Sequence, residues 1–116
     1  MAQTILFVDD VARMQAFYHG VLGLPLLTAE PDWVRLDAGG VVLGLHAIKP
    51  PRKRPDPPPE RVAAVAKLCF HVDDVDQARE ALVAAGVKMR VVHRGGDVAF
   101  CDGIDPEGNV FQITTR

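Results

Sequence analysis

The sequence predicts an α+β fold made of two similar halves, each with a strand, a helix and two or three further strands. The tetrapeptide Val-Asp-Asp-Val occurs at residues 8–11 and again at 72–75. A short apolar run precedes each copy, and a pattern typical of an amphipathic helix follows it. Residues 49–61, which hold six prolines, lie between the halves. We therefore expect one domain, residues 1–116, with a module at 1–48, a linker at 49–61 and a module at 62–116.

Each Val-Asp-Asp-Val copy is interpreted as the junction between a strand and a helix. The first valine ends the strand, the first aspartate begins the turn, and the second aspartate accepts hydrogen bonds from the free N–H groups of the first helical turn. Asp10 and Asp74 are therefore predicted N-caps. Gly23 with Pro25 ends the first helix, and Gly86 ends the second.

Both predicted helices have apolar residues spaced three and four apart, as one buried helix face requires. These residues are Met14, Phe17, Tyr18, Val21 and Leu22 in the first helix and Val75, Ala78, Leu82 and Ala85 in the second. Strand-like runs follow each helix, at 33–38 and 41–48 in the first half and at 87–92, 98–101 and 109–115 in the second. The opening strands are expected at 4–7 and 67–70, and residues 24–29 are a candidate for the remaining strand of the first half.

Composition excludes several classes of protein. The chain has 116 residues, is 48% hydrophobic and carries a net charge of −2, so no strong field attracts nucleic acid or an anionic membrane. No apolar stretch approaches the roughly 18 residues of a membrane span. Two cysteines are too few for a disulfide framework, and the first residues lack the pattern of a signal peptide, so we expect a cytoplasmic protein with free thiols.

The prolines of residues 49–61 predict an extended, stiff connection without helix or central strand. The same segment contains the basic run Arg52-Lys53-Arg54. Because prolines flank this run and the whole chain is slightly acidic, we interpret the three side chains as a solvated part of the linker rather than as a nucleic-acid or targeting patch.

Three segments together resemble the vicinal oxygen chelate superfamily, which contains glyoxalase I, bleomycin-resistance proteins and extradiol dioxygenases. They are VDDVARMQAFYHGVLGLPL at 8–26, FHVDDVDQAREALVAAGVKM at 70–89 and DPEGNVFQI at 105–113. The resemblance implies two paired βαβββ modules that form a curved mixed sheet around a cleft, which usually holds a divalent metal. It also implies a homodimer in which modules of both chains build each cleft.

Period-two alternation assigns the side chains of each strand to two faces. The face that packs under the helix is expected to carry Leu6, Val8, Leu43 and Leu45 in the first half. Its equivalents in the second half are Leu68, Phe70, Phe111 and Ile113. The opposite face mixes polar and apolar residues, which suits a ligand cleft with apolar walls. That face carries Gln3, Ile5, Phe7, Val42, Gly44 and His46, and then Lys67, Cys69, His71, Val110, Gln112 and Thr114.

The resemblance places the four metal-ligand positions of the family at Gln3, Gly44, Lys67 and Gln112. A protonated lysine has no lone pair and glycine has no side chain, so only the two glutamines can coordinate an ion. We therefore expect no metal cofactor. The alternative is a shifted site for zinc, iron or nickel that combines His46 and His71 with Gln112 or Cys69.

The leading hypothesis is a metal-independent protein that binds a small organic ligand, similar to the bleomycin-resistance branch of the family. The predicted ligand-binding residues are Gln3, Phe7, Trp33, His46, Lys67, His71 and Gln112, with Phe100 as a further apolar wall. Lys67 and the two histidines favour an anionic group such as a carboxylate, although Lys67 alternatively reaches solvent or pairs with an aspartate. The alternative for Trp33 is ordinary core packing.

The competing hypothesis is an enzyme of the same family, a lyase, isomerase or dioxygenase that uses a metal. A metal-free enzyme would use His46 or His71 as a general base beside Lys67. No catalytic residue is assigned from the sequence. His19 is expected to interact with the carboxyl end of the first helix, and His93 is expected to be solvated.

Overall fold

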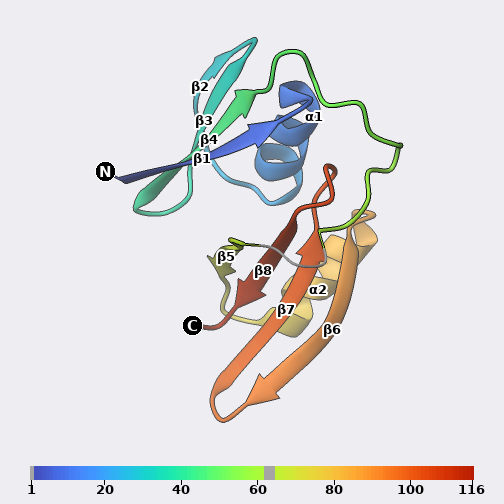
Figure 1. Ribbon diagram of the computed structural model, residues 1–116. Coiled ribbons are helices and arrows are strands. Elements are labelled where there is room, and N and C mark those ends of the chain that lie inside the picture. Colours follow the sequence, from blue (N-terminus) through green and yellow to red (C-terminus); the bar gives the residue numbers. More distant parts are fainter. Residues whose placement is uncertain (1, 62–64) are drawn as a thin grey trace. The chain divides into compact units, whose positions relative to one another are not determined.

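The computed structural model describes residues 2–61 and 65–116, and its contacts divide the chain into two compact units, Met1–Asp56 and Pro57–Arg116 (Figure 1). We call these units module 1 and module 2. Module 1 contains β1 (Ala2–Val8), α1 (Val11–Gln15), η1 (Ala16–Val21), β2 (Leu26–Glu30), β3 (Trp33–Asp37) and β4 (Val41–Ala47). Module 2 contains β5 (Leu68–His71), α2 (Val75–Ala84), β6 (Lys88–Gly95), β7 (Val98–Ile104) and β8 (Val110–Thr114).

The predicted order of one strand, one helix and three strands is confirmed in both modules. Residues 24–29 contribute to β2, the remaining strand of the first half. The predicted beginning of the second module, residues 62–64, lies outside the described residues. Each module is thus a βαβββ unit of an α+β fold.

Each module forms one four-stranded mixed sheet, in the order β1-β4-β3-β2 and β5-β8-β7-β6. The first and last strands of each module are parallel neighbours, whereas the other neighbours are antiparallel. The registers correspond, because Phe7 is opposite His46 in module 1 and His71 is opposite Thr114 in module 2. Residues of the two modules can therefore be compared position by position.

Both predicted N-caps are present. The carboxylate Oδ1 of Asp10 accepts a hydrogen bond of 3.0 Å from the backbone N–H of Arg13, and that of Asp74 accepts one of 3.0 Å from Gln77. The repeated tetrapeptide therefore caps a helix in both modules, since each second aspartate accepts a hydrogen bond from one of the free N–H groups at the start of a helix.

One side of each sheet packs against the helix that follows its first strand. Helix α1 contacts β3 and β4, and α2 contacts β6, β7 and β8 (Figure 1). The strand residues predicted for this side are largely buried, and Leu45 and Phe111 are fully so. The core of module 1 consists of Val8, Val11, Met14, Phe17, Tyr18, Val34, Leu36, Leu43 and Leu45, and that of module 2 of Val75, Leu82, Cys101, Phe111 and Ile113.

The first helix differs from the regular helix that the spacing predicts. Residues Ala16–Val21 form a π-helix, and the N–H of Leu22 donates to the carbonyl of Phe17, five residues earlier. A π-helix has more residues per turn than an α-helix, so the side chains after Tyr18 rotate away from the predicted face. Val21 is consequently 38% exposed. The His19 prediction is consistent with the structure, because its Nδ1 lies 2.8 Å from the Leu24 carbonyl oxygen.

The expectation that the polar face is open fails at three positions in the central strands. Val42, Val110 and Thr114 were assigned to the polar face, yet all three are buried. Alternation gives the side of the sheet on which a residue lies, but it does not give how much neighbouring chain covers that side. The residues of the first strands behave as predicted, and Phe7 is 58% exposed.

The proline-rich segment has no helix or strand among residues 49–61, as predicted. The interpretation of its basic run as solvated is wrong for two of the three residues. Asp9 accepts hydrogen bonds from the backbone N–H and the Nε of Arg52 and from Nη2 of Arg54. The end of the segment is bound to module 2, where the N–H of Arg61 donates to the carbonyl of Gly108.

No helix among residues 2–61 and 65–116 is long and apolar enough to cross a membrane. Cys69 and Cys101 are free thiols, the first exposed and the second buried. Desolvation by burial raises the pKa of the Cys101 thiol, against a smaller opposite effect of Arg79.

Candidate functional site

The side of the module 1 sheet that faces away from α1 carries the residues that the sequence singles out. We call it the open face of module 1. Strand pairing brings Gln3, Ile5 and Phe7 of β1 beside β4, and β3 lies on the other side of β4. This face consists of Gln3, Ile5, Phe7, Trp33, Arg35, Gly44 and His46.

Aromatic rings occupy the centre of this open face. The indole of Trp33 lies over Gly44, where an added Cβ would be 2.5 Å from Cη2 of the ring. His46 has aromatic neighbours on two strands, since its ring centroid is 5.5 Å from that of Trp33 and 5.6 Å from that of Phe7. Trp33 is half-buried on the open face, so its alternative assignment to ordinary core packing is not what the structure shows.

A polar pair lies on the same face. Nε of Arg35 donates a hydrogen bond of 3.3 Å to Oε1 of Gln3. This bond joins β1 to β3 across the central strand β4, in which Gln3 is paired with Val42 and Arg35 with Gly44. The predicted residues Gln3, Trp33 and His46 are thus on one surface, together with Arg35.

The open face of module 2 carries a polar cluster instead. Nζ of Lys67 lies 3.0 Å from Oδ2 and 3.2 Å from Oδ1 of Asp102, and Nε2 of Gln112 donates to the same Oδ1 at 3.0 Å. The Lys67 side chain is 35% exposed and the Asp102 side chain 20%. We call these three residues the Lys67 cluster. Of the two alternatives for Lys67, the structure shows pairing with an aspartate.

The other predicted residues of module 2 have partners outside this cluster. Nε2 of His71 is 2.9 Å from the backbone carbonyl oxygen of Thr115. Phe100 stacks on His93 with the ring centroids 5.2 Å apart, so the prediction that His93 is simply solvated is incomplete. Both histidines are exposed. The structure therefore does not bring His71 and Lys67 together.

The four positions that the family resemblance assigns to metal ligands carry groups that do not suit an ion. Gln3 bonds to Arg35, and the space above Gly44 is filled by an indole. Lys67 places an ammonium where a ligand atom is needed, and Gln112 offers a neutral amide that bonds to Asp102. Within residues 2–61 and 65–116, no group of three or more histidine, cysteine, aspartate and glutamate side chains is arranged to hold an ion.

Two residues of these faces were missed from the sequence, Arg35 and Asp102. They occupy equivalent positions, since Arg35 is paired with Gly44 and Asp102 with Gln112. Period-two alternation places Arg35 on the face of Trp33, and Asp102 on the face of Phe100. The same rule that was applied to the first and last strands would have found both, had it been applied to β3 and β7.

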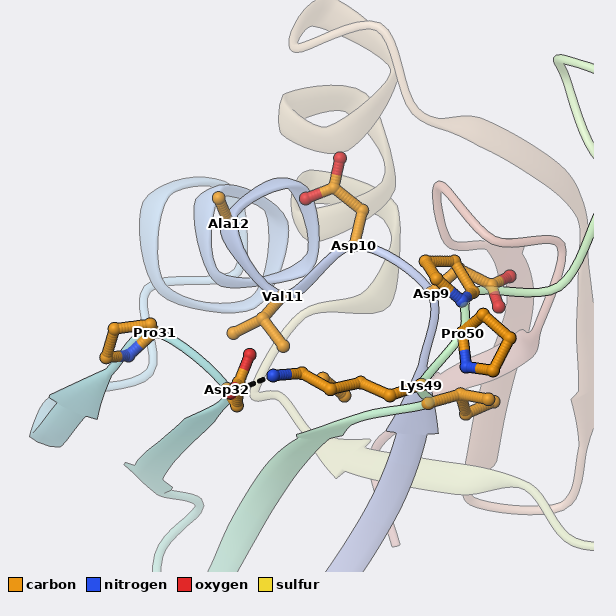
Figure 2. A pocket seen from close by; sticks show the side chains of 11 residues that line it. Asp9, Asp10, Val11, Ala12, Pro31, Asp32, Lys49 and Pro50 are labelled. Carbon is orange, nitrogen blue, oxygen red and sulfur yellow. Dashed lines mark hydrogen bonds and ion pairs between the residues drawn. The ribbon is translucent and has the colours of Figure 1, made fainter.

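A groove of about 750 Å³ lies at the end of module 1 where β1 and β4 finish (Figure 2). None of the residues predicted to bind a ligand contributes to it. Lys49 extends across the groove and forms an ion pair with Asp32. The lining consists of Asp9, Asp10, Val11, Ala12, Pro31, Asp32, Ala47, Ile48, Lys49, Pro50 and Pro51.

Asp9, on the wall of this groove, is the most strongly perturbed carboxyl group of module 1. Partial burial raises its pKa. Hydrogen bonds from the side chain and backbone of Arg52 and from the side chain of Arg54 lower the pKa by a larger amount. The pKa falls from 3.8 to about 2 as a result. Asp9 therefore acts as an anchor that stays ionised, and its negative charge is compensated by the two arginines.

Comparison with known proteins agrees with this architecture. The family model for the Glyoxalase/Bleomycin resistance protein/Dioxygenase superfamily matches residues 1–113. No curated protein matches the chain significantly.

Solved structures similar to this chain include a lactoylglutathione lyase from Agrobacterium tumefaciens, which is 27% identical with a TM-score of 0.73 and coverage of 98% of this chain and 91% of that one. A glyoxalase family protein from Enterococcus faecalis is 16% identical with a TM-score of 0.76 and coverage of 98% and 95%. The fosfomycin resistance protein FosX from Listeria monocytogenes is 14% identical with a TM-score of 0.76 and coverage of 98% and 90%, so these last two likenesses concern the fold. The chain belongs to the Glyoxalase/Bleomycin resistance protein/Dioxygenase superfamily.

Proposed function

We propose that this protein binds a small organic ligand on the open faces of its sheets without using a metal ion. One observation carries the proposal: the indole of Trp33 fills the space above Gly44, a position to which the family resemblance assigns a metal ligand. A surface that replaces ligand atoms with an aromatic ring is suited to contact an apolar or aromatic compound.

Exposure of large apolar residues on the open face of module 1 supports the proposal. Phe7 is 58% exposed and Ile5 is 43% exposed, and both lie beside His46 and Gly44 on the neighbouring strand. An apolar patch on a protein surface commonly marks a binding site. Burying Phe7 under a ligand would contribute roughly 1 to 2 kcal/mol through the area removed from water.

The polar part of the ligand is expected to accept hydrogen bonds. The anionic preference predicted from Lys67 and the histidines is weakened, because the charge of Lys67 is compensated by Asp102. Within module 2, Gln112 and the remaining N–H group of Lys67 fit a ligand oxygen of a carbonyl or a carboxylate, and within module 1 His46 offers a ring nitrogen. We propose a compound with an apolar or aromatic body and at least one such oxygen.

The alternative of a metal-dependent lyase, isomerase or dioxygenase receives no specific support from the geometry of the described residues. Within module 2, His71 bonds to a backbone carbonyl, and within module 1 His46 lies among aromatic rings.

The emission of Trp33, the one tryptophan of the chain, gives a direct test. Protein purified without chelators or an affinity tag is analysed for metals and screened against a library of small aromatic carbonyl and carboxylate compounds. We expect well under one metal ion per chain and compounds that change the emission of Trp33. The His46→Ala variant should weaken their binding about ten-fold, a loss of about 1.4 kcal/mol.

His19→Ala is the matched control, since His19 is in the same module but bonds to Leu24 in the turn after η1. It should bind as the parent does. A metal ion in stoichiometric amount that is lost in His46→Ala or Gln112→Ala would contradict the proposal. So would a screen in which binding is unaffected by His46→Ala.

We also propose that the protein is a homodimer located in the cytoplasm. Support for a dimer comes from the exposed edge strand β2, on which Leu26 and Leu27 are 40% and 45% exposed. An exposed edge with apolar side chains can pair with another chain. Light scattering on the eluted gel-filtration peak is expected to give twice the mass of the chain.

A further inference from the structure

The Lys67 cluster resembles a small cation site in which the cation is the ammonium group of a lysine side chain. Asp102 directs both carboxylate oxygens at Nζ of Lys67, at 3.0 and 3.2 Å. Gln112 bonds to the same carboxylate at 3.0 Å and holds it in place. The three side chains come from β7, from β8 and from the residue before β5, so three neighbouring stretches of backbone meet at this point.

We propose that the ammonium of Lys67 replaces the divalent ion of the family, and that this built-in cation both excludes a metal and presents N–H groups to the oxygen of the ligand. The inference rests on the proposed metal-free function, and it assigns the contact with the ligand oxygen to Lys67. The family resemblance assigns two of its ligand positions to residues 67 and 112. Here, one of these residues supplies the charge and the other supports its counter-ion.

The charge balance favours this assignment. An ion placed near Gln112 would lie close to the Lys67 ammonium, and two positive charges this near to each other repel. Among the described residues, the carboxylate of the cluster is that of Asp102, and both of its oxygens already bind the ammonium. Displacing Lys67 would remove its ion pair, so a metal would have to compete with a covalently attached cation.

The cluster retains bonding capacity toward a ligand. An ammonium has three N–H groups and a primary amide has two, together with a carbonyl oxygen. Among the described residues, the contacts of Lys67 and Gln112 with side chains use only Asp102 as partner. One ammonium N–H, one amide N–H and Oε1 of Gln112 thus stay available for a ligand oxygen or hydroxyl. These groups make the kind of contact with ligand oxygens that a chelated ion makes, but through hydrogen bonds.

In module 1 the cation on the open face is Arg35 of β3, not a lysine before the first strand. The residue at the position of Lys67 is Gln3, and that at the position of Asp102 is Arg35, so the donor and acceptor are exchanged between strands. Arg35 cannot hold an ion, and the space above Gly44 is filled by Trp33. The proposal therefore concerns module 2, and it can be tested there without a ligand.

The experiment titrates Co²⁺ into the full chain without an affinity tag, by calorimetry and by visible absorption of the bound ion. All proteins carry Cys69→Ser, which removes the exposed thiol that would bind cobalt beside Lys67. The parent is expected to bind no Co²⁺ below about 1 mM, the limit of weak affinity. Lys67→His places an imidazole beside Asp102 and Gln112, and should bind Co²⁺ at least about ten-fold more tightly. Adding Asp102→Asn should remove the gain.

Lys88→His is the matched control, because Lys88 is in the same module and pairs with a carboxylate, Glu60, at 3.0 Å. It should gain no affinity. Lys67→Gln provides a second variant if the imidazole disturbs folding, which circular dichroism would reveal. The proposal is overturned if the parent binds Co²⁺ as tightly as Lys67→His, or if both substitutions at Lys67 fold and gain nothing. Neither result depends on the ligand screen, so failure here is distinct from failure of the proposed function.

Discussion

The two modules use the same backbone with opposite distributions of side-chain size. In the core, Leu36 and Leu43 are paired neighbours in module 1, and both are fully or almost fully buried. The equivalent pair in module 2 is Gly103 and Phe111, where a Cβ added to the glycine would lie 2.5 Å from Cζ of the phenylalanine. Two leucines fill this space in module 1, and a glycine with a phenylalanine fills the equivalent space in module 2.

The open faces differ in chemistry in a corresponding way. Module 1 combines a glycine with an indole, whereas module 2 carries Gln112 bonded to Asp102. One face offers aromatic surface and the other offers hydrogen-bonding groups. The comparison teaches that duplication preserves strand pairing and helix caps, because every module needs them, while the side chains of the open faces are free to differ.

The largest expected effect comes from making the core of module 2 resemble that of module 1. Gly103→Leu forces a side chain into the space of Phe111 and Met89, and should destabilise the protein by about 3 kcal/mol or more. The double variant Gly103→Leu with Phe111→Leu restores the leucine pair of module 1 and should recover at least half of the loss. Urea unfolding followed by circular dichroism measures both.

Gly95→Ala is the control for this series, since a Cβ there has no neighbour within 4 Å. It should change the free energy of unfolding by less than about 0.5 kcal/mol. A double variant that is no more stable than Gly103→Leu alone would show that the two modules do not fill equivalent spaces.

The next effect concerns the first aspartate of each repeated tetrapeptide. Asp9→Ala leaves two partly buried arginines without their shared partner and should cost about 2 kcal/mol, whereas exposed Asp73→Ala should change stability by less than about 0.5 kcal/mol. Because the folded pKa of Asp9 is about 2 and its ordinary value is 3.8, this contribution is complete above about pH 4 and is lost as the pH falls toward 2.

Urea unfolding at pH 7 and near pH 2, followed by Trp33 emission, tests this prediction. The difference between parent and Asp9→Ala should shrink at the lower pH. An equal cost for Asp73→Ala would mean that the two junctions are energetically alike after all.

A smaller effect is expected on the open face of module 1. Gly44→Ala places a methyl group in contact with the end of the Trp33 ring, which is half-buried and can rotate outward. We expect a loss of about 1 kcal/mol and a red shift of the tryptophan emission as the indole becomes more exposed. Gly20→Ala, with no atom within 4 Å of the added Cβ, should leave the emission unchanged.

The smallest expected difference between the modules lies in their helix caps. Asp10→Ala and Asp74→Ala each remove a hydrogen bond of 3.0 Å to the first turn and should each cost about 1 kcal/mol. Hydrogen exchange of α1 and α2 would measure the two losses separately. Losses of stability that differ by more than about 1 kcal/mol between the two variants would show that the two caps are not equivalent.

The features that could be predicted from the sequence are the local ones. An N-cap depends on residues three apart, and the order of strands and helices follows from short patterns, so the caps at Asp10 and Asp74 and both βαβββ modules were found. The π-helix was missed because its sequence has the spacing of an ordinary helix. The Asp9 pairs and the Lys67 cluster join residues 43 and 35 positions apart, and they become visible only when strand register and the path of the linker are known.

The linker is attached to both modules, one attachment on each side of the boundary between them. Asp9 holds Arg52 and Arg54, while the backbone of Gly108 holds Arg61 and lies against Pro59. The boundary between the compact units falls between these attachments, at the peptide joining Asp56 to Pro57. A chain opened at that peptide would leave each half with its own anchored tail, so this is the position at which a circular permutant or a two-fragment version of the protein should be divided.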